Sequence, residues 1–396
     1  MTTDTAAPAA RVRTPKLPLS ALLALATAVF VTSLTETLPA GLLPAMSAGL
    51  GVGESAAGQA VTVYAVGTAL TAIPLAAATS AWRRKRLLLT AMAGFAVANT
   101  VTAASANYPL TMAARFVAGV AAGLAWALLA GYARALAPAE LRGRAVAVVM
   151  TGIPVALSLG VPAGTYLGGL LGWRWAFALM TAVTVGLLGW IALLVPDRPG
   201  QERGAREPVL RALTVPGVAP VLFVTLVFVL AHTVLYAYIA TFLDHAGMGG
   251  SADAVLLVFG GASLVSIWYV GARIDRRLRA LSVTATLLVA GAAALLGVFA
   301  DVPALVYAAA ALWGLGWGGV PTLLQTAAAE AGGARAEAAQ AMLVTLWNAA
   351  MAAGGVLGGL LLDLLDASAF PWTVLALLIP VLAVVVGARR HGFRAK

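Results

Sequence analysis

Long runs of apolar residues, separated by short polar segments, recur along the whole chain. A helix needs about 20 apolar residues to cross the ~30 Å hydrocarbon core of a bilayer, and runs of this length occur twelve times. The predicted spans are residues 17–44, 55–79, 87–106, 109–135, 145–171, 174–195, 217–243, 254–272, 281–300, 303–328, 338–364 and 371–388. The pattern predicts an all-α polytopic membrane protein with twelve transmembrane helices.

The longest polar segment between spans divides these helices into six and six. The first span follows a basic segment like that of a signal peptide, but it is too long for one, so we expect an uncleaved first helix. The predicted organisation is an N-terminal tail (1–16), a six-helix bundle (17–195), a linker (196–216), a second six-helix bundle (217–388) and a C-terminal tail (389–396).

Composition and charge support a membrane protein. The chain is 61% hydrophobic and only 10% charged, which is not typical of a soluble domain. Of the 25 Lys and Arg residues, 23 lie in alternate loops or tails on one side, whereas Arg174 lies opposite and Arg115 lies within a span. Because basic loops are cytoplasmic, both termini and the linker are predicted there, and the net charge of +10 reflects topology rather than a nucleic-acid partner.

Two further features of the composition limit the function. The absence of cysteine excludes disulfides, thiolate metal sites and cysteine catalysis. None of the three lysines follows a glycine, which excludes a phosphate-binding GxxxxGK[ST] loop in this chain. The arginine-rich, Ala- and Gly-rich usage is typical of a GC-rich bacterial genome and indicates a bacterial inner membrane.

The two predicted bundles repeat one another at an offset of 195 residues. This offset matches Gly119 with Gly314, Gly123 with Gly318, Gly160 with Gly355, and Gly164 with Gly359. Parallel repeats of six helices are a transporter architecture whose substrate site lies between the halves near the bilayer midplane. The alternative is a duplicated bundle without transport.

Several motifs carry a family resemblance. Arg115 is followed by Gly119 and Gly123 in the fourth span, the fifth span contains "GVPAG" from Gly160 to Gly164, and the first two spans carry "TETLPAGLLPAMSAGLGVGESAAGQAVTVYAVGTAL". The chain resembles the major facilitator superfamily, and more narrowly its drug:proton antiporter branch, which includes sugar-efflux and chloramphenicol-resistance permeases.

The resemblance implies a cytoplasmic latch in the loop between the second and third helices of each half. The second half keeps the family pattern as Gly271, Asp275, Arg276 and Arg279. The first half has Ala76 and Ser80 at the glycine and aspartate positions, so its latch is expected to be weaker. The alternative for the basic residues of that loop is topology alone, which we favour for Arg83, Arg84 and Arg86.

Glu36 and Arg115 are the clearest ionisable residues well inside spans, where charges are costly and mark function. Counted from the predicted outer ends, Glu36 lies about eight residues (~12 Å) deep and Arg115 about six residues (~9 Å) deep. The resemblance implies that their helices are neighbours, so the two can pair. A guanidinium favours the carboxylate whereas an apolar surround favours the neutral acid, and we predict a proton-coupling role for both. The alternatives are a water-exposed Glu36 and an Arg115 that binds carbonyls of neighbouring helices.

The fifth and eleventh spans carry small residues at helical spacing. Gly160 with Gly164, Gly354 with Gly358, and Gly355 with Gly359 each allow close helix contact, and Pro154 and Pro162 predict kinks. The resemblance implies that the fifth-helix motif with Gly160, Pro162 and Gly164 contacts the eleventh helix, acts in gating, and separates exporters from importers.

The remaining candidates are polar and aromatic residues that can line a substrate cavity. They are Tyr64, Asn99, Trp126, His232, Tyr236, Gln325, Trp347 and Asn348. With few charges and many aromatic rings, such a pocket suits neutral, partly apolar molecules. Packing or interfacial roles are the alternative for most of them.

These observations predict a secondary active transporter, not an enzyme, that couples proton entry to efflux of a small, largely apolar drug-like compound. It needs no cofactor or metal beyond a proton gradient, contacts lipid and a small-molecule substrate, binds no nucleic acid, and is expected to be a monomer. The alternatives are an exporter of sugars, nucleosides or other metabolites, and a membrane receptor that does not transport.

Overall fold

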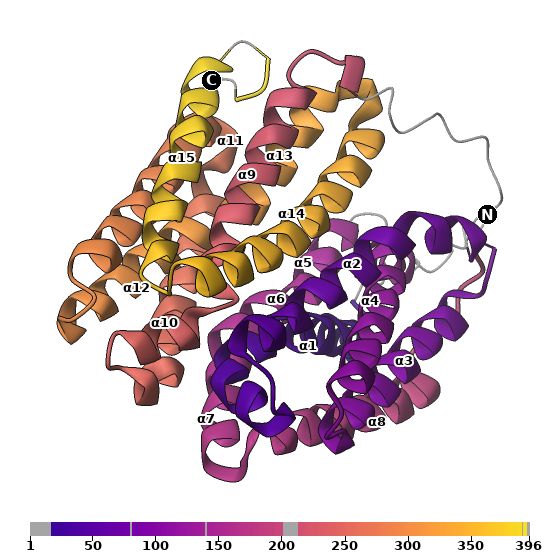
Figure 1. Ribbon diagram of the computed structural model, residues 1–396. Coiled ribbons are helices and arrows are strands. Elements are labelled where there is room, and N and C mark those ends of the chain that lie inside the picture. Colours follow the sequence, from indigo (N-terminus) through magenta and orange to yellow (C-terminus); the bar gives the residue numbers. More distant parts are fainter. Residues whose placement is uncertain (1–16, 80, 139–140, 201–212, 390, 394–396) are drawn as a thin grey trace, which may run out of the picture.

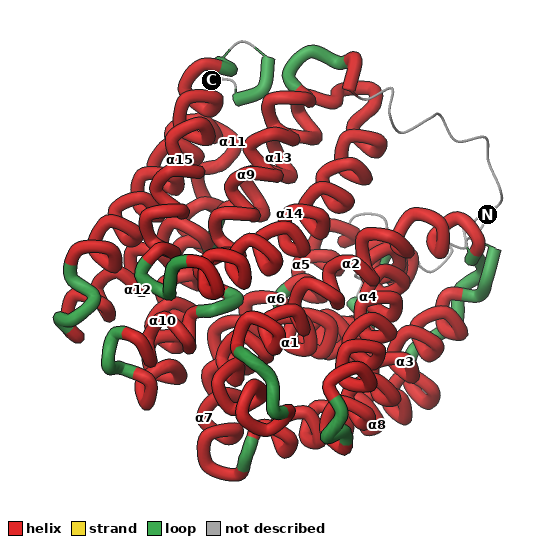
Figure 2. Tube along the Cα trace, viewed as in Figure 1, coloured by secondary structure: helices red, strands yellow, loops and turns green. Residues whose placement is uncertain are grey.

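The computed structural model describes residues 17–79, 81–138, 141–200, 213–389 and 391–393, and all regular structure in these ranges is helical. Short loops and turns join the helices (Figure 2). The predicted tail 1–16, most of the linker (201–212) and the end of the C-terminal tail lie outside the described residues, as do Ser80 of the first basic loop and the side chain of Asp275.

Within the residues that the structure describes, the first half contains eight α-helices and one π-helix. They are α1 (Leu19–Leu50), α2 (Glu54–Ala78), α3 (Arg84–Ala104), α4 (Tyr108–Leu136), α5 (Arg142–Met150), α6 (Gly152–Val155), the π-helix η2 (Ala156–Gly160), α7 (Val161–Leu171) and α8 (Trp173–Leu194), with η2 counted between α6 and α7. The elements α5, α6, η2 and α7 together form the predicted fifth span.

The second half contains one long, kinked helix, α11, and several shorter elements. They are α9 (Val218–Tyr236), α10 (Ile239–His245), the 3₁₀ turn η4 (Gly249–Ser251), α11 (Ala252–Val298), α12 (Pro303–Trp317), α13 (Val320–Gly332), η5 (Gly333–Arg335), α14 (Ala336–Leu364) and α15 (Ala369–Gly387). Eleven segments of the described residues are long and apolar enough to cross a membrane, and α2, the predicted second span, is a continuous helix of 25 residues.

Helix α1 is longer than predicted. The first span was expected to end at Pro44, but the helix continues through Pro39 and Pro44 to Leu50. It ends at Gly51, which adopts a left-handed conformation (φ 65°) and donates its N–H to the carbonyls of Ser47 and Ala48, a common glycine helix terminus. At 1.5 Å per residue, Glu36 lies ~21 Å from this end, near the middle of the helix rather than close to its outer end.

Three predicted spans are interrupted, two of them where the sequence contains Pro or Gly. Pro162 lacks an N–H and crowds the carbonyl of the preceding turn, and the π-helix η2 lies there, a feature often found at functional sites. Gly318 and Gly319 separate α12 from α13, and a Gly pair is a usual cause of a kink. Tyr238 has a non-helical conformation between α9 and α10.

The connection expected between the eighth and ninth spans is shorter than predicted. Residues 273–280 were expected to form a polar loop, but α11 runs through them with a single non-helical residue, Arg277 (φ −137°, ψ 28°). This segment contains neither Pro nor Gly, so most of it remains helical. The chain therefore turns at one kink.

The two halves pack side by side (Figure 1). Within the first half, α4 packs against α2 and α3, and α3 packs against α8; within the second, α11 packs against α12 and α15, and α14 packs against α9. Between the halves, α2 packs against α14, while η2 and α7 pack against α11. The interface is therefore built from the second and fifth spans of one half and the eighth and eleventh spans of the other.

The 195-residue repeat is visible in two equivalent hydrogen bonds, one in each half. The Thr68 hydroxyl donates to the Gly119 carbonyl (3.0 Å), and the equivalent Ser263 hydroxyl donates to the Gly314 carbonyl (3.3 Å). A Cβ on either glycine would collide with the backbone of an equivalent residue, Tyr64 or Phe259. Both positions therefore need glycine because two helices cross there at backbone contact.

Candidate functional site

Arg115 is fully buried inside the first half. Its Nη2 donates to the Thr35 carbonyl of α1 (2.7 Å) and its Nε donates to the Ala60 carbonyl of α2 (3.2 Å). The guanidinium also lies 5.1 Å from the centre of the Tyr64 ring, within the range of a cation–π interaction. Nη1 has no hydrogen-bond partner among the described residues. Arg115 thus joins α1, α2 and α4 through backbone carbonyls.

Glu36 follows Thr35 directly, so its backbone lies beside the Arg115 guanidinium. Its side chain is partly exposed and close enough for the two charges to interact, but no ion pair within 4.0 Å joins these two described residues. The predicted pairing therefore takes another form: Arg115 binds the backbone of α1, and the Glu36 carboxylate stays free of it. A proton-coupling role for both remains a prediction.

Asn99 and Tyr64, predicted to line a cavity, extend the network around Arg115. Asn99 Nδ2 donates to the Thr35 hydroxyl (3.1 Å), and the Tyr64 hydroxyl donates to the Thr32 carbonyl (3.1 Å). Both side chains are fully buried, and Asn99 Oδ1 has no partner among the described residues. We call Thr35, Tyr64, Asn99 and Arg115 the polar core.

The second half contains a group of stacked rings in the corresponding region. His232 stacks on Trp317 with ring centres 3.5 Å apart and planes 6° apart, and its Nδ1 lies 3.1 Å from Nε1 of Trp313. Further ring contacts within 6.1 Å connect these to neighbouring helices. We call this group the aromatic cluster; it consists of Phe228, His232 and Tyr236 on α9, Phe259 on α11, Trp313 and Trp317 on α12, and Trp347 on α14.

Sequence reasoning singled out three members of the aromatic cluster and missed the others. Spacing could have found them, because Phe228, His232 and Tyr236 recur every four residues, as do Trp313 and Trp317. Such spacing places side chains on one helix face. The cluster approaches the first half through Tyr236, whose hydroxyl lies near Thr37 and Glu36 of α1.

The other predicted cavity residues do not gather with these two groups. Trp126 on α4 is partly exposed, and Gln325 on α13 is exposed. Asn348 is buried, and its Nδ2 donates to the Val344 carbonyl of its own helix (2.9 Å). Their substrate-binding role remains a prediction.

The glycines of the fifth span pack against α1. A Cβ on Gly160 would lie 3.0 Å from the Phe30 ring, and one on Gly164 would lie 2.6 Å from Leu38. In the other half, the main neighbour of η2 and α7 is α11, and the Ser158 hydroxyl donates to its Gly260 carbonyl (2.8 Å). The main contacts of this motif are therefore with α1 and with the eighth span, and the expected contact with the eleventh span is not among them. Pro162 is buried at the η2–α7 junction, and the gating role of this motif remains a prediction.

Tyr238 fills the interface between α2 and α14. Its hydroxyl donates to the Gly355 carbonyl (2.9 Å) and accepts from Gln59 Nε2 (3.3 Å). A Cβ on Gly58 or on Gly358 would collide with its ring. Close by, the Ser55 hydroxyl donates to Asp363 (2.8 Å), and the Thr241 hydroxyl donates to Glu54. These contacts join the halves at the end of the molecule opposite the basic loops.

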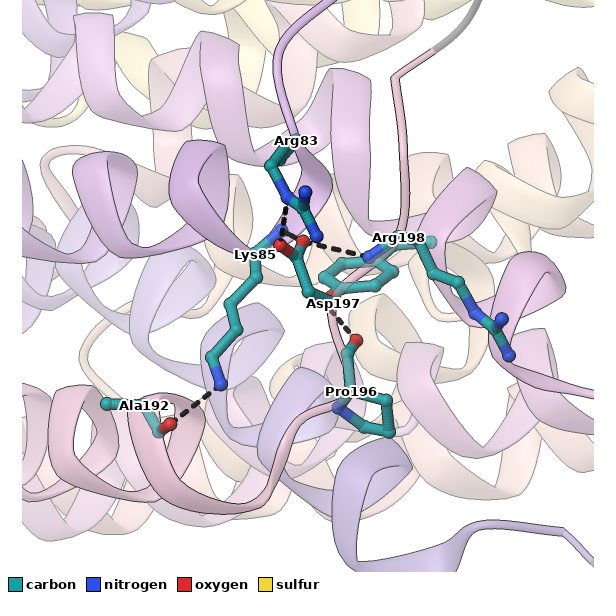
Figure 3. A network of polar contacts seen from close by, with 7 residues as sticks. Arg83, Lys85, Ala192, Pro196, Asp197 and Arg198 are labelled. Atoms are coloured by element: carbon teal, nitrogen blue, oxygen red, sulfur yellow. Dashed lines mark hydrogen bonds and ion pairs between the residues drawn. The ribbon is translucent and has the colours of Figure 1, made fainter.

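The basic loop of the first half is tied to the end of α8 by Asp197, a residue that sequence reasoning missed. Arg83 forms an ion pair with Asp197, and the backbone N–H groups of Lys85 (3.2 Å) and Arg198 (2.8 Å) also donate to it (Figure 3). Lys85 Nζ donates to the Ala192 carbonyl (2.7 Å). Arg83 therefore has a specific partner, beyond the topological role that we favoured for it.

The second half shows a related contact. Arg279 Nη2 donates to the Val386 carbonyl (2.8 Å), near the end of α15 as Ala192 is near the end of α8. Cations favour the carbonyl end of a helix. Gly271 and Arg276 are exposed, and a Cβ on Gly271 would meet no atom within 4 Å. The side chain of Asp275 lies outside the described part, so a latch at this loop remains a prediction.

The described part of the site contains charged and aromatic side chains but no metal centre. Among the described residues there is no group of three or more His, Cys, Asp or Glu side chains that could hold a metal ion. The chemistry available is a partly exposed carboxylate, a buried guanidinium beside its backbone, and a group of aromatic rings of which Tyr236 lies near Glu36.

Comparisons with known proteins agree on one family. A family model described as Major Facilitator Superfamily matches residues 25–355. The chain is 32% identical over 383 residues to the chloramphenicol efflux pump MT0201 of Mycobacterium tuberculosis, covering 91% of this chain and 90% of the relative. It is 30% identical over 353 residues to the transcription regulatory protein OpdE of Pseudomonas aeruginosa, covering 87% of each.

The fold has a counterpart among solved structures. The crystal structure of the human organic anion transporter MFSD10 (TETRAN) aligns with a TM-score of 0.70 and 16% sequence identity, covering 93% of this chain and 99% of that chain. This likeness concerns the fold alone. With the family match, it confirms the predicted all-α fold of twelve transmembrane helices.

Proposed function

Since this chain belongs to the Major Facilitator Superfamily, whose members are transporters and not enzymes, we propose that it couples proton entry to the efflux of a small, largely apolar, drug-like compound. The protein is a multi-span membrane transporter of small molecules. We place it in a bacterial inner membrane as a monomer with both termini, the linker and the basic loops in the cytoplasm. Alternating access would then move residues 17–195 against residues 217–388 around a site between them.

The observation that carries the proposal is the placement of Glu36. It lies near the middle of α1, is partly exposed, and is adjacent to Thr35, whose carbonyl binds the buried Arg115. A carboxylate inside a membrane helix is rare and functional by default. One conformation can leave it near the guanidinium and water, and another can surround it with apolar groups, so that the carboxylate alternately releases and takes up a proton.

The substrate class is supported by the aromatic cluster and by relatives. Rings from four helices lie on the second-half side of the interface, and apolar pockets with few polar groups suit drug-sized neutral molecules. Two M. tuberculosis relatives are named chloramphenicol efflux pumps. Both observations favour efflux of an aromatic compound over that of a sugar or nucleoside.

The proposal is tested by Glu36→Gln in inverted vesicles with an imposed proton gradient. We expect the variant to lose gradient-driven transport while wild type retains it, because the amide cannot carry a proton. Asp301→Asn, in an exposed loop between α11 and α12, removes one carboxylate elsewhere and serves as the control. Unimpaired gradient-driven transport by Glu36→Gln would remove Glu36 from the mechanism.

A receptor that does not transport is the second candidate, because one relative is named a transcription regulatory protein. The two are separated with purified protein in liposomes, where no partner is present. A transporter moves a compound such as chloramphenicol across the membrane when a proton gradient is imposed. A receptor binds it without movement in either direction.

A further inference from the structure

His232 is held by a hydrogen bond that specifies where its proton lies. Its Nδ1 is 3.1 Å from Nε1 of Trp313, and both side chains are buried. An indole N–H can only donate, so Nδ1 must be the acceptor and carries no hydrogen. A neutral imidazole has one N–H, which leaves the hydrogen of His232 on Nε2.

The surrounding rings fix the orientation of this imidazole. Trp317 stacks on it at 3.5 Å, and the centres of the Tyr236 and Phe259 rings lie 5.1 and 6.1 Å away. Rotation of the imidazole would break the bond from Trp313 and this stacking together. The position of the Nε2–H is therefore preset before any ligand arrives.

The Nε2–H has no hydrogen-bond partner among the described residues, although 8% of the His232 surface remains accessible. A donor of this kind is available to an acceptor on a ligand that lies against the rings. We propose that Trp313 locks His232 as the neutral Nε2–H tautomer, so that the aromatic cluster selects neutral aromatic compounds that carry an oxygen acceptor such as a carbonyl. This inference rests on the proposed function for its biological meaning.

The lock also keeps His232 out of proton transfer. An imidazolium carries hydrogen on both nitrogens, so protonation would set an Nδ1–H against the Trp313 N–H. The groups that face His232 are Tyr236 on its own helix, Phe259 on α11, and Trp313 and Trp317 on α12, with Trp347 of α14 behind Trp317. Glu36 of α1 approaches through Tyr236. No carboxylate among the described residues forms an ion pair with His232, so proton exchange is left to Glu36.

Nitrogen-15 NMR of the imidazole tests the lock without requiring transport. The chain has three histidines, and the double variant His245→Gln with His391→Gln leaves His232 alone. We expect the Nε2–H tautomer from about pH 8 to about pH 5, across which a free imidazole titrates. An imidazolium or an Nδ1–H tautomer within this range would overturn the lock.

Trp313→Phe, made in the same background, keeps a ring but removes the N–H. We expect His232 to become protonated within that pH range and its tautomers to mix. Trp372→Phe changes an exposed tryptophan and should leave the His232 signal as in wild type. If Trp313→Phe does not fold, the test of the lock rests on the His232 tautomer measured in the double variant with Trp313 intact.

Binding of a matched probe pair tests the selectivity. We expect purified protein in nanodiscs to bind 2-acetylnaphthalene about tenfold more tightly than 2-ethylnaphthalene, as one hydrogen bond would give. His232→Phe should keep ring binding and lose the preference. Equal binding of both probes by wild type overturns the selectivity, whereas a preference without efflux upholds it and contradicts only the proposed function.

Discussion

The two halves use equivalent backbone contacts to hold side chains of opposite chemistry. In each half, a hydroxyl one turn after an aromatic residue donates to the carbonyl of a glycine in the fourth helix of that half. The residues around this contact differ. At the 195-residue offset, the polar residues Thr35, Glu36, Tyr64, Asn99 and Arg115 correspond to Leu230, Ala231, Phe259, Ala294 and Ala310.

The aromatic cluster shows the reverse pattern. Apart from Phe259, its members correspond in the first half to small residues, namely Ser33, Thr37, Gly41, Ala118, Ala122 and Gly152. The first half therefore carries Arg115 and its polar partners, whereas the second half carries most of the rings. In the proposed function, the first half would exchange the proton through Glu36 and the second half would bind the aromatic substrate.

The largest effect on stability is expected for Arg115→Met, which gives the first half an apolar residue as in the second. The change removes two charge-assisted hydrogen bonds to carbonyls, each worth about 1.5–3 kcal/mol, offset by the cost of burying the guanidinium. We expect a net loss of about 2–4 kcal/mol in the free energy of unfolding, measured by denaturation in detergent. The exposed Arg276→Met is the control, and equal stability of both variants would contradict a structural role for Arg115.

Gly119→Ala and Gly314→Ala test the shared scaffold. A methyl group at either position meets backbone of the neighbouring helix, and overpacking of this kind costs about 1–3 kcal/mol. We expect losses of similar size in the two halves, measured by the same denaturation.

The helical Gly131 and Gly291 give one control in each half, because a Cβ there meets no atom within 4 Å. Their change to Ala should be neutral or stabilise by up to about 1 kcal/mol. A large loss in only one half would mean that the two crossings are not equivalent.

Hydropathy predicted the number of helices, and the repeat matched Gly119 with Gly314 without predicting that helices cross there. The resemblance to the family, rather than either pattern, implied that Arg115 lies near the first helix. Hydropathy did not predict the length of α1, because two prolines looked like an end and the terminating Gly51 lies seven residues later. The role of Asp197 was missed because its partner Arg83 lies 114 residues away.

The aromatic cluster was found only in part for a related reason. In a chain this rich in Ala and Leu, hydropathy does not distinguish helix faces that meet lipid from faces that meet other helices. Trp313 and Trp372 look alike in sequence, yet one is buried at 1% exposure and the other is 51% exposed. Only the helix arrangement separates them.

Tyr64→Phe makes a smaller change toward the second half, where Phe259 is the equivalent residue. It removes the hydroxyl that donates to the Thr32 carbonyl and keeps the ring next to Arg115. We expect a loss of about 1 kcal/mol in the free energy of unfolding. Tyr166→Phe, at an exposed position, should change it very little, and equal effects of the two substitutions would show that the Tyr64 bond does not stabilise the polar core.

The smallest effect is expected for Asp197→Asn, and it should depend on pH. Partial burial acts to raise the pKa of Asp197, but the hydrogen bonds from Arg83 and from the N–H groups of Lys85 and Arg198 outweigh it and hold the pKa below its usual value. The ionised group therefore contributes stability above the unfolded value of about 3.9, and this contribution is lost as the pH falls through the folded pKa.

We expect wild type to exceed Asp197→Asn by about 0.2–1 kcal/mol at pH 7, with the gap closing below about pH 3. The measurement is unfolding in detergent at both pH values. Arg279→Met in the second half is the matched comparison, because Arg279 binds a backbone carbonyl and not a carboxylate. The difference in unfolding free energy between wild type and Arg279→Met should persist at low pH. If the differences for both variants closed equally, the cause would be acid unfolding in general rather than protonation of Asp197.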